Sequence, residues 1–379
     1  MSKIIVFGAG HMGIPIAYAL RKLGHAVTVF DKYAVNITQS KVVLGVSGTL
    51  PNGYVSEDGV RVIEADVNNI AEHVKIKPDV VVSALPFWCN KNLASYCIHE
   101  GIRYVDLGGD VETTEEIVRI ARIHATLPVA TDQGLAPGLV NIVAEAGCTL
   151  LPAMPDDVLM AVGGLPAARG LNPLEYLATW SIEGLVNEYQ GEGWAILNGK
   201  KTKVDALSGV ENIAFRGKNL EAFYTSGGSA HSIDSMLKRG VRYCAYKTMR
   251  YPGHRDMVRF LMNKCGLSND LMGGIFKIGC STEDEEFSDD AVKIHVELRS
   301  DNGLRWVKQH NFTTGFKFSA MQRTTGYSVA SVAHLLSQGF YDNSEDKVID
   351  YEALNIPAFH DTFKKMLKTD EVLEEPWIL

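Results

Sequence analysis

The segment from Lys247 to His254 carries side chains that can bind a carboxylate and move a proton. Arg250 can clamp a carboxylate through two parallel hydrogen bonds. His254 titrates near neutral pH and can accept a proton. A surface arginine and a histidine at a helix start form the plain structural alternative. The density of polar residue types favours function, with Arg250 and Tyr251 as substrate-binding candidates and His254 as the base.

A second set of polar side chains lies on a predicted helix, Trp180–Tyr189. Glu183 and Asn187 are four residues apart and therefore share one face of that helix. The pair could hold a substrate ammonium, with Glu183 as a catalytic candidate and Asn187 as a substrate-binding one. A solvent-facing helix surface explains the same spacing.

Two acidic residues end neighbouring predicted strands, Tyr104–Leu107 and Pro128–Asp132. Asp106 and Asp132 are therefore expected at one edge of the sheet, where they could orient an amine or relay a proton. They could equally cap helices, a frequent use of aspartate. We treat Asp132 as a catalytic candidate and Asp106 as a cofactor-binding one.

The N-terminus supplies the elements of a dinucleotide-binding unit. A strand, Lys3–Phe7, runs into the turn Gly8–Gly13, then a helix, Ile14–Leu23, and a second strand, Ala26–Phe30, closed by Asp31. A G-x-G-x-x-G turn alone is weak, but here the strand, helix, second strand and acid all follow at the expected spacing. A glycine-rich turn that holds no ligand is the alternative.

Each part of this motif has a physical task. Gly8 permits the tight turn, Gly10 lets the backbone approach a pyrophosphate, and Gly13 lets the helix lie close to the strand. The free N–H groups at the helix start attract the pyrophosphate. Asp31 can accept hydrogen bonds from the adenosine ribose and favours NAD, while Lys32 leaves some tolerance for the 2′-phosphate of NADP. The loop residues expected to bind the cofactor are Gly8, Gly10, His11, Met12 and Gly13.

A further loop follows the strand predicted over Asp79–Ala84. In open α/β sheets the ligand lies at the carboxyl ends of the strands, so this loop is expected near the nicotinamide ribose or the substrate. An ordinary loop between strand and helix is the alternative. Its cofactor-binding candidates are Ser83, Ala84, Leu85 and Pro86.

The remaining pattern predicts two domains. Strands and helices alternate up to Asp132, which predicts a doubly wound parallel sheet of the Rossmann type. Strands become longer from Asp157, and Ala291–Ser300 and Leu304–Phe312 flank an Asp-Asn-Gly hairpin turn, which predicts an α+β domain with a mixed sheet. A predicted helix, Thr324–Gly339, is expected to return to the first domain. We therefore expect a discontinuous dinucleotide-binding domain (1–135 and about 325–379) and a substrate-binding and dimerisation domain (about 136–324).

Composition excludes several classes of protein. The net charge of −8 without blocks of like charge argues against nucleic-acid binding, and the acidic run Glu283–Glu286 is expected to be a solvated loop. No apolar run reaches transmembrane length and no signal peptide is visible, so we expect no membrane association. Six scattered cysteines without a C-x-x-C pair are typical of a reduced cytoplasmic protein. The histidines lack metal-ligand spacing, so no metal is expected.

With these motifs in view, the chain resembles the saccharopine dehydrogenase family, and most of all its short branch that includes lysine 6-dehydrogenase. The most specific motif is Asp-x-Gly-Leu-Ala-Pro-Gly, together with the later Arg-Tyr-Pro-Gly-His. The matching segments are Val6–Gly13, Ser83–Pro86, Asp132–Gly138, Gly163–Pro166, Trp180–Tyr189, Leu220–Phe223, Thr225–Gly228, Lys247–His254 and Arg323–Gly326.

The resemblance implies NAD(P)-dependent oxidation at the C–N bond of an amino acid, or the reverse reductive condensation. It also implies a homodimer or larger homo-oligomer. Longer saccharopine-forming members have larger substrate domains, so the length of this chain favours a small substrate such as lysine. The hypothesis is oxidative deamination: NAD binds in the first domain, the amino-acid carboxylate lies on Arg250, and His254 removes a proton from the ammonium.

Two alternatives remain open. A condensing reductase of the same family would join an aldehyde or 2-oxo acid to an amine, as in saccharopine or carboxynorspermidine formation. A sensor or scaffold protein would bind NAD without chemistry. The polar segments around Glu183 and Arg250 count against this last class, since a binding-only module needs no such cluster.

Overall fold

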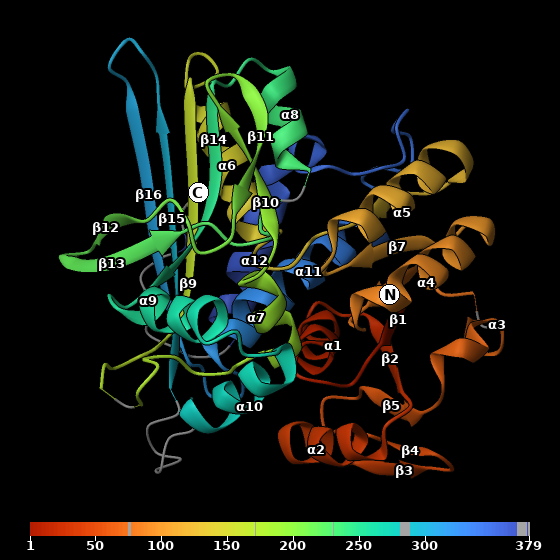
Figure 1. The fold of residues 1–379 in the computed structure, drawn as a ribbon. Helices are drawn as coiled ribbons and strands as arrows, with labels where there is room; N and C mark the ends of the chain where they lie inside the picture. The colour runs from red at the N-terminus through yellow and green to blue at the C-terminus, as the bar shows by residue number, and fades with distance from the viewer. Residues whose placement is uncertain (75–76, 171, 230, 281–288, 370–376, 378–379) are drawn as a thin grey trace. The chain divides into compact units, whose positions relative to one another are not determined.

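The computed structural model describes residues 1–74, 77–170, 172–229, 231–280, 289–369 and 377 (Figure 1). The chain divides into two compact units. The described residues of 1–138 and 322–369 form the first unit. The described residues of 139–321, together with Trp377, form the second. The solvated loop expected at Glu283–Glu286 lies outside the described residues.

The first unit contains a sheet in the order β3-β4-β5-β2-β1-β6-β7-β8. All neighbours from β5 to β8 are parallel, whereas β3, β4 and β5 pair antiparallel at one edge. The strand order reverses direction between β1 and β6, which is where a doubly wound sheet binds its ligand. The strands are β1 (Lys3–Phe7), β2 (Ala26–Asp31), β3 (Gly48–Leu50), β4 (Gly53–Val55), β5 (Arg61–Glu64), β6 (Val80–Ser83), β7 (Arg103–Asp106) and β8 (Val129–Ala130).

Helices pack on this sheet through its alternating side chains. On one face, Ile5, Val81 and Tyr104 form a core with apolar residues of α4 (Phe87–His99) and α5 (Val111–His124). The other helices of this unit are α1 (Gly13–Lys22), α2 (Ala34–Leu44), α3 (Ile70–His73), α11 (Ala320–Ser337) and α12 (Ile356–Lys368). The predicted Rossmann fold is therefore confirmed.

The second unit contains a mixed sheet in the order β11-β10-β14-β9-β15-β16, with β13 pairing to β14 and β12 to β13. β9 and β14 run parallel, and the other described pairs are antiparallel. The predicted mixed sheet and the predicted hairpin are both confirmed. Its strands are β9 (Asp157–Pro166), β10 (Glu192–Leu197), β11 (Lys200–Asp205), β12 (Glu211–Phe215), β13 (Lys218–Phe223), β14 (Tyr243–Arg250), β15 (Asp290–Arg299) and β16 (Arg305–Thr313).

Two groups of helices surround this sheet. α6 (Leu139–Leu150) contacts β15 and β9, and α8 (Ser232–Lys238) contacts β10, β11 and β14. The others are α7 (Ile182–Glu188), α9 (His254–Arg259), the π-helical turn Phe260–Lys264 and α10 (Asn269–Gly279). They enclose a separate core that includes Tyr176, Tyr189 and Phe276. This second core positions the end of β14 and the start of α9.

Two elements differ from their predicted bounds. Strand β8 is shorter than predicted, because Asp132 has a left-handed φ of 62°, which an extended strand does not contain. Helix α4 begins at Phe87 rather than Asn92, directly after Pro86, whose own conformation is extended. Both differences lie where loops leave the carboxyl edge of the sheet.

Two helical glycines provide a test of packing in each unit. A Cβ at Gly326 of α11 would lie 2.9 Å from Pro15 Cβ of α1, whereas a Cβ at Gly274 of α10 would meet nothing within 4 Å. We expect Gly326→Ala to destabilise the fold by about 1–3 kcal/mol through overpacking. The matched Gly274→Ala should stabilise it by about 0.5–1 kcal/mol. Urea unfolding measures both, and equal effects of the two substitutions would contradict this packing.

Candidate functional site

The glycine loop between β1 and α1 is tight on its inner side and open on its outer side. A Cβ at Gly8 would lie 2.6 Å from Ala84 O, and one at Gly13 would lie 1.8 Å from Gly8 O. A Cβ at Gly10 would meet nothing within 4 Å. No side chain caps the start of α1 and no acid lies in its first turn. The free N–H groups and open Gly10 backbone therefore fit a pyrophosphate.

The other loop residues frame this helix start. His11 is exposed and Met12 is half-buried. The His11 carbonyl accepts a hydrogen bond of 3.0 Å from the Gln322 side chain, which ties the loop to α11 within the same unit.

The Asp31 carboxylate is fixed at the end of β2. Its Oδ2 accepts hydrogen bonds from Ala9 N at 2.7 Å and from Asn36 Nδ2 at 2.9 Å, and its Oδ1 accepts one from Tyr33 N at 2.7 Å. The buried carboxylate thus joins the second strand to the glycine loop. The neighbouring Lys32 is exposed, with its ammonium 4.9 Å from the centre of the Tyr33 ring.

The loop after β6 lies against the glycine loop. Ala84 N donates to Phe7 O at 2.8 Å, next to the close approach of Gly8 to Ala84. Ser83 is buried, and its hydroxyl donates to Asn90 Oδ1 at 2.7 Å. Leu85 is half-buried and Pro86 is exposed. The structure therefore brings the two predicted cofactor loops together, with the Ser83 hydroxyl engaged inside the protein.

Asp106 and Asp132 form a buried carboxylate pair at the ends of β7 and β8. Asp106 Oδ1 accepts hydrogen bonds from Gly108 N and Asp132 N, both at 2.9 Å, and its Oδ2 accepts one from Tyr104 at 3.0 Å. Burial and the nearby Asp132 charge raise the pKa of Asp106 to about 7. Asp132 Oδ1 accepts from the Thr114 hydroxyl at 3.1 Å.

The space beside this pair requires glycine. A Cβ at Gly108, where φ is 76°, would lie 2.0 Å from Asp132 Oδ1. In the loop that follows β8, two buried polar atoms on either side of Asp132 have no hydrogen-bond partner among the described residues. They are Thr131 Oγ1 and Gln133 Oε1. Unsatisfied buried groups are uncommon, and such strain concentrates at functional sites.

In the second unit, Arg250 ends β14 inside an aromatic cluster. Its Nε donates to the Tyr189 hydroxyl at 2.9 Å and its Nη1 donates to Met249 O at 3.0 Å. The guanidinium lies 4.7 Å from the centre of the Tyr176 ring, a cation–π contact. Arg250 is only 3% exposed. Nη2 makes no hydrogen bond with the described residues and is available to a ligand.

His254 lies in the same cluster and is fully buried. Its Nδ1 is 2.7 Å from Leu174 O and its Nε2 is 2.9 Å from the Tyr189 hydroxyl. Burial and the nearby Arg250 charge lower the pKa of His254 to about 3. The histidine is therefore neutral, with both ring nitrogens bonded, and it orients the tyrosine that holds Arg250.

Sequence reasoning missed Glu188, the last residue of α7. Its half-buried side chain makes no hydrogen bond or ion pair with the described residues. Burial raises the pKa of Glu188 to about 7, although the Arg250 charge acts in the opposite direction. A carboxyl group with a pKa near neutrality beside a buried arginine is suited to proton transfer. Its position directly before Tyr189, on the turn that enters the buried core, was the available signal.

The other predicted residues of this unit lie elsewhere. Glu183 and Asn187 are both exposed on α7, and Glu183 accepts a hydrogen bond from the Ser181 hydroxyl at 3.1 Å. Tyr251 is buried and donates to Pro166 O at 3.0 Å, at the end of β9. The structure thus joins Arg250 with His254, and it brings neither Glu183, Asn187 nor Tyr251 into hydrogen-bond contact with Arg250.

The described part of the chain contains neither of two other kinds of feature, a metal site and a membrane-spanning helix. Within those residues no group of three or more His, Cys, Asp or Glu side chains is arranged to hold a metal ion. No helix formed by the described residues is long and apolar enough to cross a membrane.

The strand order and the glycine loop define a Rossmann domain of the kind that binds a dinucleotide. Two family models match the chain: the saccharopine dehydrogenase NADP binding domain over residues 4–132 and the saccharopine dehydrogenase C-terminal domain over residues 134–370. The chain therefore belongs to the saccharopine dehydrogenase family.

Similar folds occur among solved structures. The apo saccharopine dehydrogenase (L-Glu forming) from Saccharomyces cerevisiae aligns with a TM-score of 0.72 at 17% identity, over 97% of each chain. A mutant meso-dapdh with DAP from Clostridium tetani aligns at 0.46 and 10% identity, over 98% of this chain and 100% of that one. An engineered D-amino acid dehydrogenase bound to NADP+ aligns at 0.46 and 11%, over 94% and 95%. Only the first likeness is close enough to show a shared fold.

The yeast structure corrects one expectation. The length of this chain favours a small substrate only if saccharopine-forming members are longer. An enzyme named saccharopine dehydrogenase aligns over 97% of both chains, so the two are of nearly equal length. Chain length therefore does not discriminate between lysine and saccharopine.

The raised pKa of Asp106 gives a test of the carboxylate pair. The folded protein holds this proton more tightly than the unfolded chain, so the group stabilises the fold below about pH 4 and loses this contribution as pH rises through about 7. Asp106→Asn cannot ionise. We expect its stability relative to the unmodified protein to be higher at pH 8 than at pH 5, measured by urea unfolding. A difference that does not change with pH would contradict the assignment.

Proposed function

We propose that this protein oxidises the C–N bond of an amino acid with a nicotinamide cofactor, most simply by oxidative deamination of L-lysine or a similar amino acid. The main support for this proposal is the buried Arg250, which keeps one guanidinium nitrogen available to a ligand. The carboxyl group of Glu188 lies near enough for the Arg250 charge to act on its pKa, and it has no ion-pair partner among the described residues. An arginine and a base next to each other match the carboxylate and the ammonium of an amino acid.

The proposed roles follow from these contacts. Arg250 binds the substrate carboxylate, while Tyr189 and Tyr176 hold its guanidinium in place. Glu188 accepts a proton from the substrate ammonium. A bound nicotinamide would supply the acceptor for the hydride that leaves the carbon bearing the amine. The resulting C=N bond is hydrolysed by water to a carbonyl compound and ammonia. His254 stays neutral and positions Tyr189, so we assign the proton transfer to Glu188 in preference to His254.

For the cofactor we propose NAD, with NADP also possible. The Asp31 carboxylate is held at the end of β2 by three hydrogen bonds, and a 2′-phosphate near it would meet like charge. The exposed Lys32 would partly offset that repulsion. The other predicted roles, those of Asp132 and Glu183 in catalysis and of Asn187 and Tyr251 in substrate binding, remain predictions, as do a homo-oligomer and a cytoplasmic location.

The direct test is a spectrophotometric screen of amino acids and diamines with NAD and NADP in parallel. The proposal expects NADH or NADPH to form with an amino acid alone. No absorbance change with any of them would overturn it and leave two classes, a condensing reductase and a protein that binds the cofactor without chemistry.

A condensing reductase is the second candidate. The name of the yeast enzyme with the same fold and length supports keeping it. In this case NAD(P)H would be consumed only when an aldehyde or 2-oxo acid is supplied together with an amine. The same instrument distinguishes the two, because lysine alone would then reduce no NAD.

Asp31→Ser tests the cofactor preference. Removal of the carboxylate removes the repulsion from a 2′-phosphate. We expect the ratio of kcat/KM with NADP to that with NAD to rise by about tenfold or more, which corresponds to about 1.4 kcal/mol. An unchanged ratio would mean that another residue sets the preference.

Glu188→Gln tests the base. An ionised base is required, so kcat/KM for oxidation should rise with pH through about 7 in the unmodified protein. The variant should lose about 100-fold or more in kcat and should lose this rise as well. Glu192→Gln, which removes an exposed glutamate paired with Lys203 in the same unit, is the matched control. A kcat within a few-fold of normal in Glu188→Gln would exclude it as the base.

A further inference from the structure

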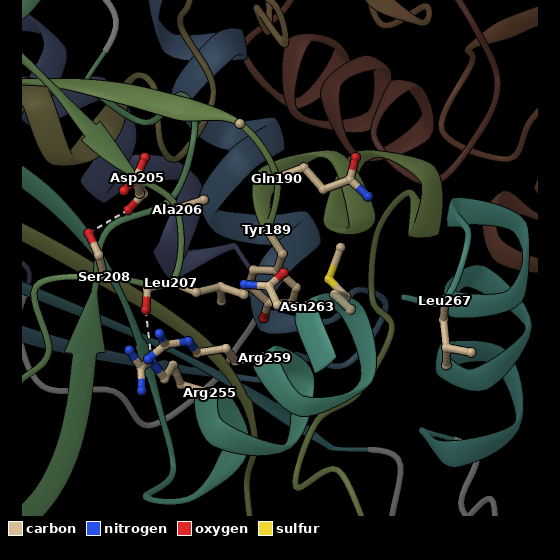
Figure 2. A pocket seen from close by; sticks show the side chains of 12 residues that line it. Tyr189, Gln190, Asp205, Ala206, Leu207, Ser208, Arg255, Arg259, Asn263 and Leu267 are labelled. Carbon is tan, nitrogen blue, oxygen red and sulfur yellow. Dashed lines mark hydrogen bonds between the residues drawn. The ribbon is translucent and has the colours of Figure 1, made fainter. Parts of the chain in front are cut away.

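A pocket of about 430 Å³ lies in the second unit (Figure 2). Its lining comes from the end of α7, the turn after β11, helix α9 and the π-helical turn that follows α9. Neither Arg250 nor His254 lines it. Tyr189 belongs to both places, since it lines the pocket and its hydroxyl bonds to Arg250 and His254.

Two arginines of α9 supply positive charge to this pocket. Arg255 and Arg259 are four residues apart and share one helix face. Arg255 donates from Nε to Leu207 O at 2.7 Å and from Nη1 to Asp256 at 2.6 Å, which leaves Nη2 without a described partner. Arg259 is exposed and has no hydrogen bond or ion pair with the described residues. Asp256 already pairs with Arg255, so Arg259 carries the positive charge that has no ion-pair partner among the described residues and is open to a ligand carboxylate.

Polar groups of other elements complete the lining. Asp205, at the end of β11, is exposed and its carboxylate has no ion-pair partner among the described residues. The Ser208 hydroxyl donates to the Asp205 carbonyl at 2.6 Å, which fixes this turn (Figure 2). Asn263 enters from the π-helical turn Phe260–Lys264 and offers both a donor and an acceptor. Such turns are rare and frequently mark functional sites.

We infer that this pocket is a second binding site for a free amino acid, with its carboxylate on Arg255 and Arg259 and its ammonium on Asp205. The volume falls within the range of small-molecule sites, about 300–1,000 Å³. A phosphate ion would fill little of it, and a second negative charge would be repelled by Asp205. The site goes beyond the proposed function, because it holds its ligand away from Arg250.

The shared tyrosine couples this site to the Arg250 cluster. A ligand in the pocket contacts the residue whose hydroxyl holds both Arg250 and His254. Any shift of Tyr189 on binding therefore changes the position of the Arg250 guanidinium. By the same linkage, a ligand bound at Arg250 changes the affinity of the pocket.

The test is isothermal titration calorimetry of the full chain with L-glutamate, L-lysine, glycine and inorganic phosphate, without cofactor and therefore without turnover. We expect one of the three amino acids to bind, and its Kd to rise at least tenfold in Arg259→Gln and in Asp205→Asn. Arg216→Gln, an exposed arginine of the same unit outside the pocket, should leave it unchanged. Arg250→Gln leaves the proposed ligand contacts of the pocket in place, so binding should persist and its Kd should change by less than in Arg259→Gln, by no more than the coupling through Tyr189 produces.

Three results would overturn the inference. The first is that no amino acid binds, and the second is that binding is lost in Arg250→Gln but kept in Arg259→Gln. The third is that phosphate binds more tightly than any amino acid and gains affinity in Asp205→Asn. Should Arg250→Gln fail to fold, a two-site isotherm in the unmodified protein that becomes one-site in Arg259→Gln supports the inference, and an unchanged isotherm overturns it. Failure of the oxidation assay has no bearing on these results, since none of them requires turnover.

Discussion

The burial of a positive charge at Arg250 is the interaction on which the second unit depends. An isolated buried charge is costly, so its surroundings must compensate for it. Tyr189 accepts a hydrogen bond from the guanidinium, the Tyr176 ring stacks on it, and Trp180 donates to the Tyr176 hydroxyl at 2.8 Å. The charge also sets its neighbours, because it helps to keep His254 neutral and lowers the otherwise raised pKa of Glu188. Burial and this one cation together thus set the protonation of the cluster, while the contacts to Tyr189 and Tyr176 hold its geometry.

The first unit solves a different problem, the close approach of backbone to a phosphate ligand. The absence of side chains at Gly8 and Gly13 lets two strands and a helix meet, and Gly10 leaves the outer surface open. The buried Asp31 carboxylate, bonded to Ala9 N, holds this loop and marks the end of the second strand. Catalysis in such enzymes depends on how the protein orients the cofactor and handles protons, and the proposal gives the first task to the first unit and the second task to the Arg250 cluster.

Local patterns predicted much of this structure. The N-terminal strand, turn and helix, the alternation that follows and the Asp-Asn-Gly hairpin are encoded by neighbouring residues, so the fold class followed from the sequence, as did the family. The short β3–β4 hairpin was missed, although Pro51-Asn52 marks its turn. The candidate site was harder to predict from the sequence, because packing between distant segments decides which side chains are buried. Glu183 and Asn187 have the right spacing on α7 but face solvent, whereas Glu188 is drawn inward, and the bonding of His254 depends on Leu174, 80 residues earlier.

The central claim is that Arg250 binds the carboxylate of an amino acid that is then oxidised. The most direct measurement is kcat/KM of Arg250→Gln for the amino acid that reduces the cofactor, together with the Kd of NADH. Loss of a buried charge partner costs about 2–5 kcal/mol, so kcat/KM should fall by about 30-fold or more while the Kd of NADH stays unchanged. A kcat/KM within threefold of that of the unmodified protein would contradict the account.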